Sequence, residues 1–113
     1  MSQPVLLKVY GNLYPADAAD LEALSRASAS CVQEGDDAVV TLAGDLLRIS
    51  FEGLFFPVDD VLAALAAILK PEQKGKLDVL DLEDWRLTRH LFAEGRISSR
   101  SAPLNNVLDF SGH

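Results

Sequence analysis

The chain has 113 residues, 49% of them hydrophobic and 24% charged, a composition typical of one globular domain and unlike disordered, collagen-like or disulfide-rich chains. The formal net charge of −7 disfavours nucleic acid and anionic membranes as partners, because both are bound through clustered Lys and Arg. Cys31 is the only cysteine, so an internal disulfide is excluded and a reducing compartment, the cytoplasm, is expected.

The sequence predicts no targeting or membrane-spanning segment. Residues 1–7 have neither the basic flank nor the apolar core of a secretory signal. The longest apolar run, Val61 to Leu69, has nine residues, whereas a membrane-spanning helix needs roughly 18 or more. We therefore expect no membrane partner.

Four elements are predicted in the first half of the chain. Apolar alternation over 4–10 predicts a mostly buried strand. A helix over about 16–33 follows, because acidic residues favour its N-terminus and apolar residues share one face. Two β-prone runs, 38–42 and 46–51, flank the turn sequence Ala43-Gly44-Asp45 and predict an antiparallel hairpin.

A second helix is predicted between Pro57 and Pro71. Its central residues, Val61 to Leu69, are all apolar and leave no polar stripe, which a helix on a solvated sheet face would have. We therefore expect this helix to be buried on all sides, either inside the fold or against a partner.

The C-terminal third has weaker patterns. Residues 77–80 predict a short strand, and 82–94 predict a third helix with acidic residues in its first turn. A strand is the competing interpretation of 82–94, because apolar and polar residues alternate over 85–89. Apolar residues in 102–113 predict a tail that docks on the domain.

These elements together predict a single α+β domain over 1–113. We expect an antiparallel or mixed sheet of about four strands covered by about three helices, in the order β-α-β-β-α-(β)-α-(β).

No catalytic, metal or cofactor motif is recognised. Gly75-Lys76 lacks the first glycine and the hydroxyl residue of a phosphate-binding loop. Four acids gather in one segment: Asp78, Asp81, Glu83 and Asp84. They lack the order of a calcium loop and fit a helix start better. His90 has only Glu94 as a carboxylate within helical reach, and Cys31 is expected to be a core side chain.

Two groups of residues are candidate binding surfaces. The first is an apolar interface: Leu54, Phe55, Phe56, Leu62, Leu65 and Leu69. The second is a possible anion-binding cluster: Arg86, Arg89, His90, Arg96 and Arg100. This cluster has three interpretations: it binds an anionic ligand such as a carboxylate, it binds the acidic N-terminal half of another copy, or it pairs with that half within the same chain.

The hypothesis that follows is a non-catalytic protein-interaction module that self-associates as a homodimer through the apolar interface. One alternative is a small-molecule binding protein or modest enzyme that takes an anionic or apolar ligand. Another is an acidic adaptor or inhibitor of a basic protein. No nucleic acid, membrane, metal or cofactor is expected.

Overall fold

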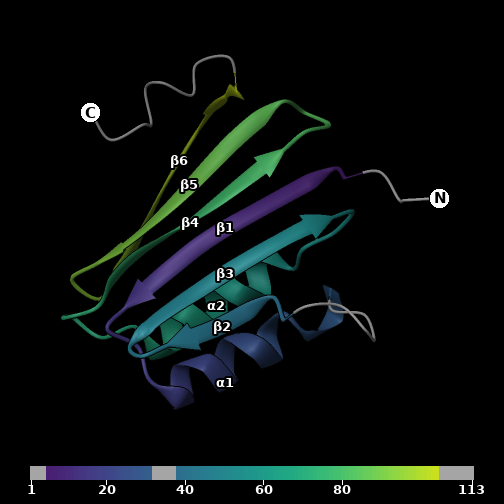
Figure 1. Cartoon of the computed structure of the whole chain (residues 1–113). Helices are drawn as coiled ribbons and strands as arrows, with labels where there is room; N and C mark the ends of the chain where they lie inside the picture. The colour runs from purple at the N-terminus through teal and green to yellow at the C-terminus, as the bar shows by residue number, and fades with distance from the viewer. Residues whose placement is uncertain (1–4, 32–37, 105–113) are drawn as a thin grey trace.

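The computed structural model describes residues 5–31 and 38–104 (Figure 1). Six strands and two α-helices follow one another, with one short 3-10 helix after the first α-helix. In chain order they are β1 (Leu7–Tyr14), α1 (Ala18–Ala27), η1 (Ala29–Cys31), β2 (Val40–Ala43), β3 (Leu46–Gly53), α2 (Val58–Ile68), β4 (Lys74–Asp81), β5 (Arg86–Ala93) and β6 (Arg96–Pro103).

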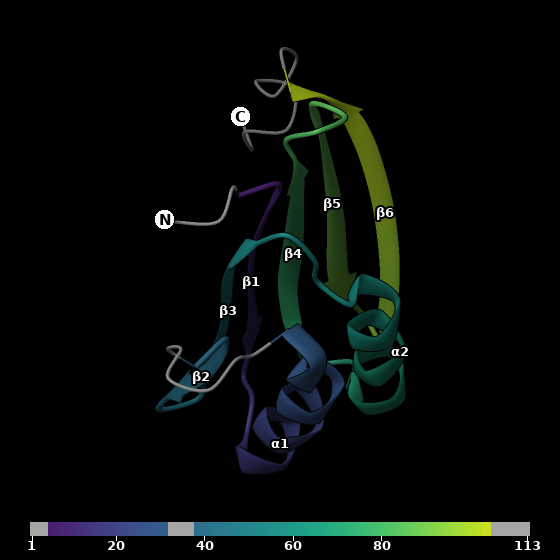
Figure 2. The same ribbon diagram turned by 90° about the vertical axis from the view of Figure 1, so that its right-hand side faces the viewer.

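The strands form one antiparallel sheet in the order β2-β3-β1-β4-β5-β6. The segment from β1 to β4 has the split βαββαβ topology called ferredoxin-like, and the hairpin β5–β6 extends the sheet beyond β4. Strand β1 lies at the centre, between β3 and β4. Both helices cover the same side of the sheet, and the other side carries neither helix (Figure 2).

Regular pairing divides the strand residues between two faces. Side chains alternate along a strand, and the register of these strand pairs has no bulge, so partners in adjacent strands share a face. Odd-numbered residues of β1, β3, β4 and β6, with even-numbered residues of β2 and β5, point toward the helices. We call the opposite surface the open face.

The core lies between the sheet and the helices. Its most deeply buried apolar side chains include Val9, Leu13, Leu47, Ile49, Leu77 and Phe92 from the strands and Leu24, Val61 and Leu65 from the helices. Burial of each such side chain contributes roughly 1.5–3 kcal/mol to folding. Most of the buried apolar side chains therefore lie in one layer on the helix side, whereas on the open face Leu87 of β5 is the apolar side chain that is also buried.

A buried polar cluster joins α1, the end of β1 and the start of β4. Gln73 is 1% exposed, and its Nε2 donates hydrogen bonds to Asp20 Oδ2 at 2.9 Å and to the Pro15 carbonyl at 2.8 Å. The Gln73 Oε1 accepts a hydrogen bond from the Lys70 backbone N–H. Asp20 also belongs to the capping box that begins α1 at Asp17. This cluster positions the chain where β4 begins.

The outer side of α2 explains why the helix has no polar stripe. Val61 and Leu65 point into the core, while the exposed positions after its acidic first turn are Ala63, Ala66 and Ala67. An alanine methyl group exposes little apolar area, so these positions can face water without a polar stripe. The missing stripe therefore does not require that every side of the helix be covered.

The predicted count of strands and helices is wrong. The sheet has six strands rather than about four, and two α-helices cover it rather than three. Residues 82–94 form a turn followed by strand β5, so the competing strand interpretation describes most of this segment. The cap-like signal has a different origin: the Asp81 carboxylate accepts hydrogen bonds from the backbone N–H groups of Glu83 and Asp84, closing a turn.

Other predictions agree with the structure in part. The hairpin around Gly44, which has a φ of +63°, and the helix between Pro57 and Pro71 are confirmed. In the proposed docking tail, residues 102 and 103 belong to β6, and 105–113 lie outside the described residues. Among the helices of the described segments, none is long and apolar enough to cross a membrane.

Candidate functional site

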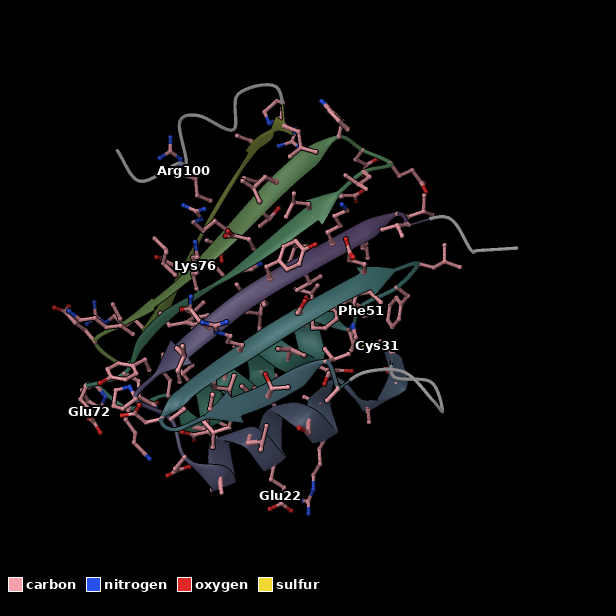
Figure 3. All side chains as sticks on the ribbon, in the orientation of Figure 1. Glu22, Cys31, Phe51, Glu72, Lys76 and Arg100 are labelled. Atoms are coloured by element: carbon pink, nitrogen blue, oxygen red, sulfur yellow. The ribbon has the colours of Figure 1, made fainter. Side chains whose placement is uncertain are left out.

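Basic side chains gather on the open face of the sheet. The register places seven of the ten basic residues there: Lys8, Arg48, Lys74, Lys76, Arg89, Arg96 and Arg100. Only two acidic residues of the strands, Glu52 and Asp78, share this face. Figure 3 looks onto the face, with Lys76 and Arg100 labelled over β4 and β6. A chain with a net charge of −7 thus has one surface with a local excess of five positive charges.

Asp78 is the acidic centre of one ion-pair network on this face. Two Arg89 nitrogens, Nε and Nη2, donate to its two carboxylate oxygens at 2.7 and 3.0 Å. Lys76 Nζ lies 3.8 Å from the same carboxylate. The hydrogen bond to Asp78 raises the pKa of the Arg89 guanidinium above its ordinary value. Asp78 therefore neutralises part of the basic surface and fixes the Arg89 side chain.

Glu52 anchors a second contact, which positions an aromatic ring. The Tyr10 hydroxyl donates to Glu52 Oε1 at 3.0 Å, and Lys8 Nζ lies 3.3 Å from the same oxygen. These hydrogen bonds lower the pKa of the Glu52 carboxyl, while burial and Glu52 together raise the pKa of Tyr10. Tyr10 is therefore a neutral phenol, and its ring leans across the face toward β3.

Three cations on the open face form no ion pair with any described residue: Arg48, Lys74 and Arg96. All three are exposed. Neighbouring strands lie about 4.8 Å apart, so Arg48 on β3 and Arg96 on β6 are separated by roughly 19 Å across the sheet. The three cations without an ion pair are therefore spread across the width of the sheet, a distance that an extended polyanion can span.

The structure divides the predicted anion-binding cluster between two faces. Arg89, Arg96 and Arg100 lie together on the open face, whereas Arg86 and His90 point to the helix side. Arg86 donates a hydrogen bond to the Ser101 hydroxyl on β6. His90 is 7% exposed, and its Nδ1 lies 2.7 Å from Ser99 Oγ. These five residues therefore do not form one site.

The buried His90 side chain should make stability depend on pH. Burial lowers its pKa below the ordinary value, and the charges of Asp78 and Asp59 oppose this shift only in part. Because the unfolded chain binds the proton more readily, stability should be full above a pH of about 6.5, fall below it, and level off below the folded pKa.

Urea unfolding between about pH 5 and 8 measures this effect. His90→Gln is the matched variant, and we expect the loss of stability in that window to be smaller than in the wild type. The carboxyls of Asp17 and Glu52, with lowered pKa values, lose their contributions in a separate window below about pH 4. Equal pH dependence of wild type and variant would contradict the assignment to His90.

The six residues of the predicted apolar interface also separate. Phe56 and Leu65 belong to the core, and Leu62 and Leu69 pack partly against it. Leu54 and Phe55, in the connection from β3 to α2, are 47% and 60% exposed. Trp85, in the β4–β5 turn at the same end of the sheet, is 57% exposed. Self-association stays a prediction, and of the six predicted interface residues only Leu54 and Phe55 expose large apolar side chains for it.

The cysteine and the acidic residues that could have been reactive or metal-binding make contacts that support the fold instead. Cys31 is half-buried, its Sγ donates to the Ser28 carbonyl, and burial raises the pKa of the thiol, which keeps it protonated. Asp81 closes a turn, while Asp78 pairs with Arg89. Within residues 5–31 and 38–104, no three His, Cys, Asp or Glu side chains are grouped to hold a metal ion.

Sequence reasoning did not single out four of the basic residues: Lys8, Arg48, Lys74 and Lys76. The pattern that could have identified them is the alternation of apolar and polar residues along a strand. Arg48, Ser50 and Glu52 lie opposite the buried Leu47 and Ile49 on β3, as expected for a strand with one wet face. The order of the strands, which joins these positions to β5 and β6, is not visible in a local pattern.

In comparisons with known proteins, no family model, curated protein or solved structure matches this chain.

Proposed function

We propose that the chain is a non-catalytic binding module whose open sheet face takes an extended anionic partner. The observation that carries the proposal is the segregation of charge, with seven basic and two acidic residues on the open face of an acidic protein. Arg26, Lys70 and Arg86 are the only basic residues elsewhere.

Electrostatics favours a long anion over a small one. Arg48 and Arg96 are the outermost of the open-face cations that lack an ion pair with a described residue, and their separation of roughly 19 Å is too large for both to meet one carboxylate or phosphate. A polymer that touches several of them releases counterions at each contact, so the individually modest attractions add up. The acidic residues on the rest of the molecule would repel the polymer and direct it to this face.

The side chains available on and near the open face also favour a binding module over an enzyme. His90, the only histidine in the described part of the chain, is buried and bonded to Ser99. The open face holds Lys, Arg, Tyr and Asn side chains, which bind and orient anions, and its two carboxylates, Glu52 and Asp78, are engaged in ion pairs with Lys8 and Arg89. We place this function in the cytoplasm, where a protein with a single cysteine needs no disulfide.

The test compares two triple variants that remove the same amount of charge. Arg48→Gln/Lys74→Gln/Arg96→Gln removes cations from the open face, and Arg26→Gln/Lys70→Gln/Arg86→Gln removes cations elsewhere. Binding of labelled inorganic polyphosphate is measured by fluorescence anisotropy between about 50 and 200 mM salt.

We expect the open-face variant to bind at least tenfold more weakly than the wild type. The slope of log affinity against log salt should become less steep by about two, because each lost cation–phosphate contact with a flexible single-stranded polyanion removes about 0.7 from the slope and three contacts are lost. The control variant should stay within about threefold. Thermal unfolding checks that both fold. No binding by the wild type at low salt, or equal losses in the two variants, would refute the proposed function.

A further inference from the structure

We propose that the extended anion is a single-stranded nucleic acid, with bases stacked on Tyr10 and Tyr14 and phosphates held by the cations on either side. This inference rests on the proposed function and names the class of its ligand. It departs from the expectation that net charge excludes nucleic acid, because binding responds to the local charge of a surface rather than to the sum over the chain.

The two rings lie on the central strand of the open face. Tyr10 and Tyr14 both point to this face and are 39% and 53% exposed. They lie four residues apart on β1, roughly 13 Å along the strand. Exposed aromatic rings on a sheet are platforms on which unpaired bases stack, whatever the base. The hydrogen bond from Tyr10 to Glu52 orders one ring before any ligand binds.

Polar and basic side chains surround these rings in register. Asn12 lies between them on the same face and pairs with Arg48 on β3 and Lys76 on β4. Tyr14 pairs with Lys74 on β4. Cations thus lie on both sides of the two tyrosines, about one strand spacing away. The Asn12 amide can donate hydrogen bonds to a base edge and accept hydrogen bonds from it. A strand running along β1 would meet stacking, hydrogen-bonding and phosphate contacts together.

The chemistry of this surface fits bases better than an acidic peptide. Its centre consists of two phenol rings, an amide and long cationic side chains. The two carboxylates on the face are already paired, Glu52 with Lys8 and Asp78 with Arg89, which lowers their repulsion toward phosphate. Carboxylate side chains of a peptide would use the cations but leave the rings without a stacking partner.

The experiment uses a fluorescein-labelled oligothymidylate of about 12 nucleotides, within the site sizes known for single-strand binding proteins. Parallel titrations use an abasic oligonucleotide of the same length, the complementary duplex, polyglutamate and inorganic polyphosphate. Wild type is compared with Tyr10→Leu/Tyr14→Leu and with Phe55→Leu/Trp85→Leu, which removes two exposed aromatic rings that belong to connections at the end of the sheet and not to its strands.

We expect the wild type to bind oligothymidylate at least tenfold more tightly than the abasic strand, the duplex or polyglutamate. The Tyr10/Tyr14 variant should lose at least tenfold for oligothymidylate and stay within about twofold for polyphosphate, because stacking is lost while phosphate contacts remain. The Phe55/Trp85 variant should match the wild type for both.

The outcomes separate this inference from the function on which it rests. Binding of polyphosphate together with equal affinities for thymidylate and abasic strands would overturn nucleic-acid recognition and leave anion binding in place. Tighter binding of polyglutamate or of the duplex would also overturn it, in favour of an acidic protein or of phosphate contacts alone. Failure of the wild type to bind any of the polyanions would refute both.

Discussion

Gln73→Leu is expected to lower the free energy of unfolding by about 3 to 4 kcal/mol. The substitution removes three hydrogen bonds inside the protein, to Asp20, to the Pro15 carbonyl and from the Lys70 N–H. It also leaves the Asp20 carboxylate, which is 3% exposed, beside an apolar side chain. Each buried group left without its partner costs about 1–3 kcal/mol, so the loss exceeds that of a typical surface substitution.

Thermal and urea unfolding measure this loss, and the midpoint temperature should fall by roughly 15 °C. Glu72→Leu is the matched control, because Glu72 is the exposed preceding residue and its replacement should change stability by no more than about 0.5 kcal/mol. A Gln73→Leu protein within about 1 kcal/mol of the wild type would show that the cluster does not hold α1 and β4 together.

Gly75→Ala should cost about 3 kcal/mol by forcing the two central strands apart. A Cβ at Gly75 would lie 2.0 Å from the Asn12 carbonyl oxygen and 3.0 Å from the Leu13 Cα, both of them backbone atoms of β1. Backbone cannot swing aside as a flexible side chain can, so the pairing of β1 with β4 must shift. Because Lys74 and Lys76 flank Gly75, the same shift disturbs the open face.

Gly95→Asn is the control for Gly75→Ala. Gly95 lies in the β5–β6 turn with a φ of +73°, and no atom lies within 4 Å of a Cβ placed there. Asn tolerates this left-handed conformation, so its cost should stay below about 1 kcal/mol. Amide hydrogen exchange of β1 and β4 provides the second measurement. Unchanged protection and stability in Gly75→Ala would contradict the close approach of these strands.

The same glycine explains one error of the sequence-based prediction. The predicted strand covers only 77–80, whereas β4 begins at Lys74, because Lys74 and Lys76 point to water and Gly75, at the inward position between them, has no side chain to give an apolar alternation. Strand β6, which the sequence predicts only as an optional last strand, has a weak pattern for a similar reason, since Ile97 is the only large apolar residue among its inward positions. Strands 38–42 and 46–51 were predictable because their inward residues are large and apolar.

The helix predicted over 82–94 failed for a different reason. Asp81 binds the next backbone N–H groups in the same way whether a helix or a turn follows, so the local signal is shared by both structures. Long-range pairing of β5 with β4 decides the outcome. In α2, apolar residues on every side predict complete burial, although the outward residues after the first turn are alanines, whose small apolar area can face water.

The candidate site depends even more on long-range pairing. Its cations extend along the chain from Lys8 to Arg100, and only the order β3-β1-β4-β5-β6 brings them onto one surface. The sequence could show three of them, Arg89, Arg96 and Arg100, because they are neighbours in a hairpin. It could not separate them from Arg86 and His90 without the strand assignment that fixes which side each residue faces.

Nuclear magnetic resonance mapping tests the charged open face most directly. Isotopically labelled protein is titrated with inorganic polyphosphate while backbone amide and arginine side-chain signals are followed. Our account predicts the largest changes at Arg48 on β3, at Lys74 and Lys76 on β4 and at Arg96 on β6, with little change along α1 and α2. Changes confined to the helices or to the Leu54–Phe55 connection, or none at all, would contradict it.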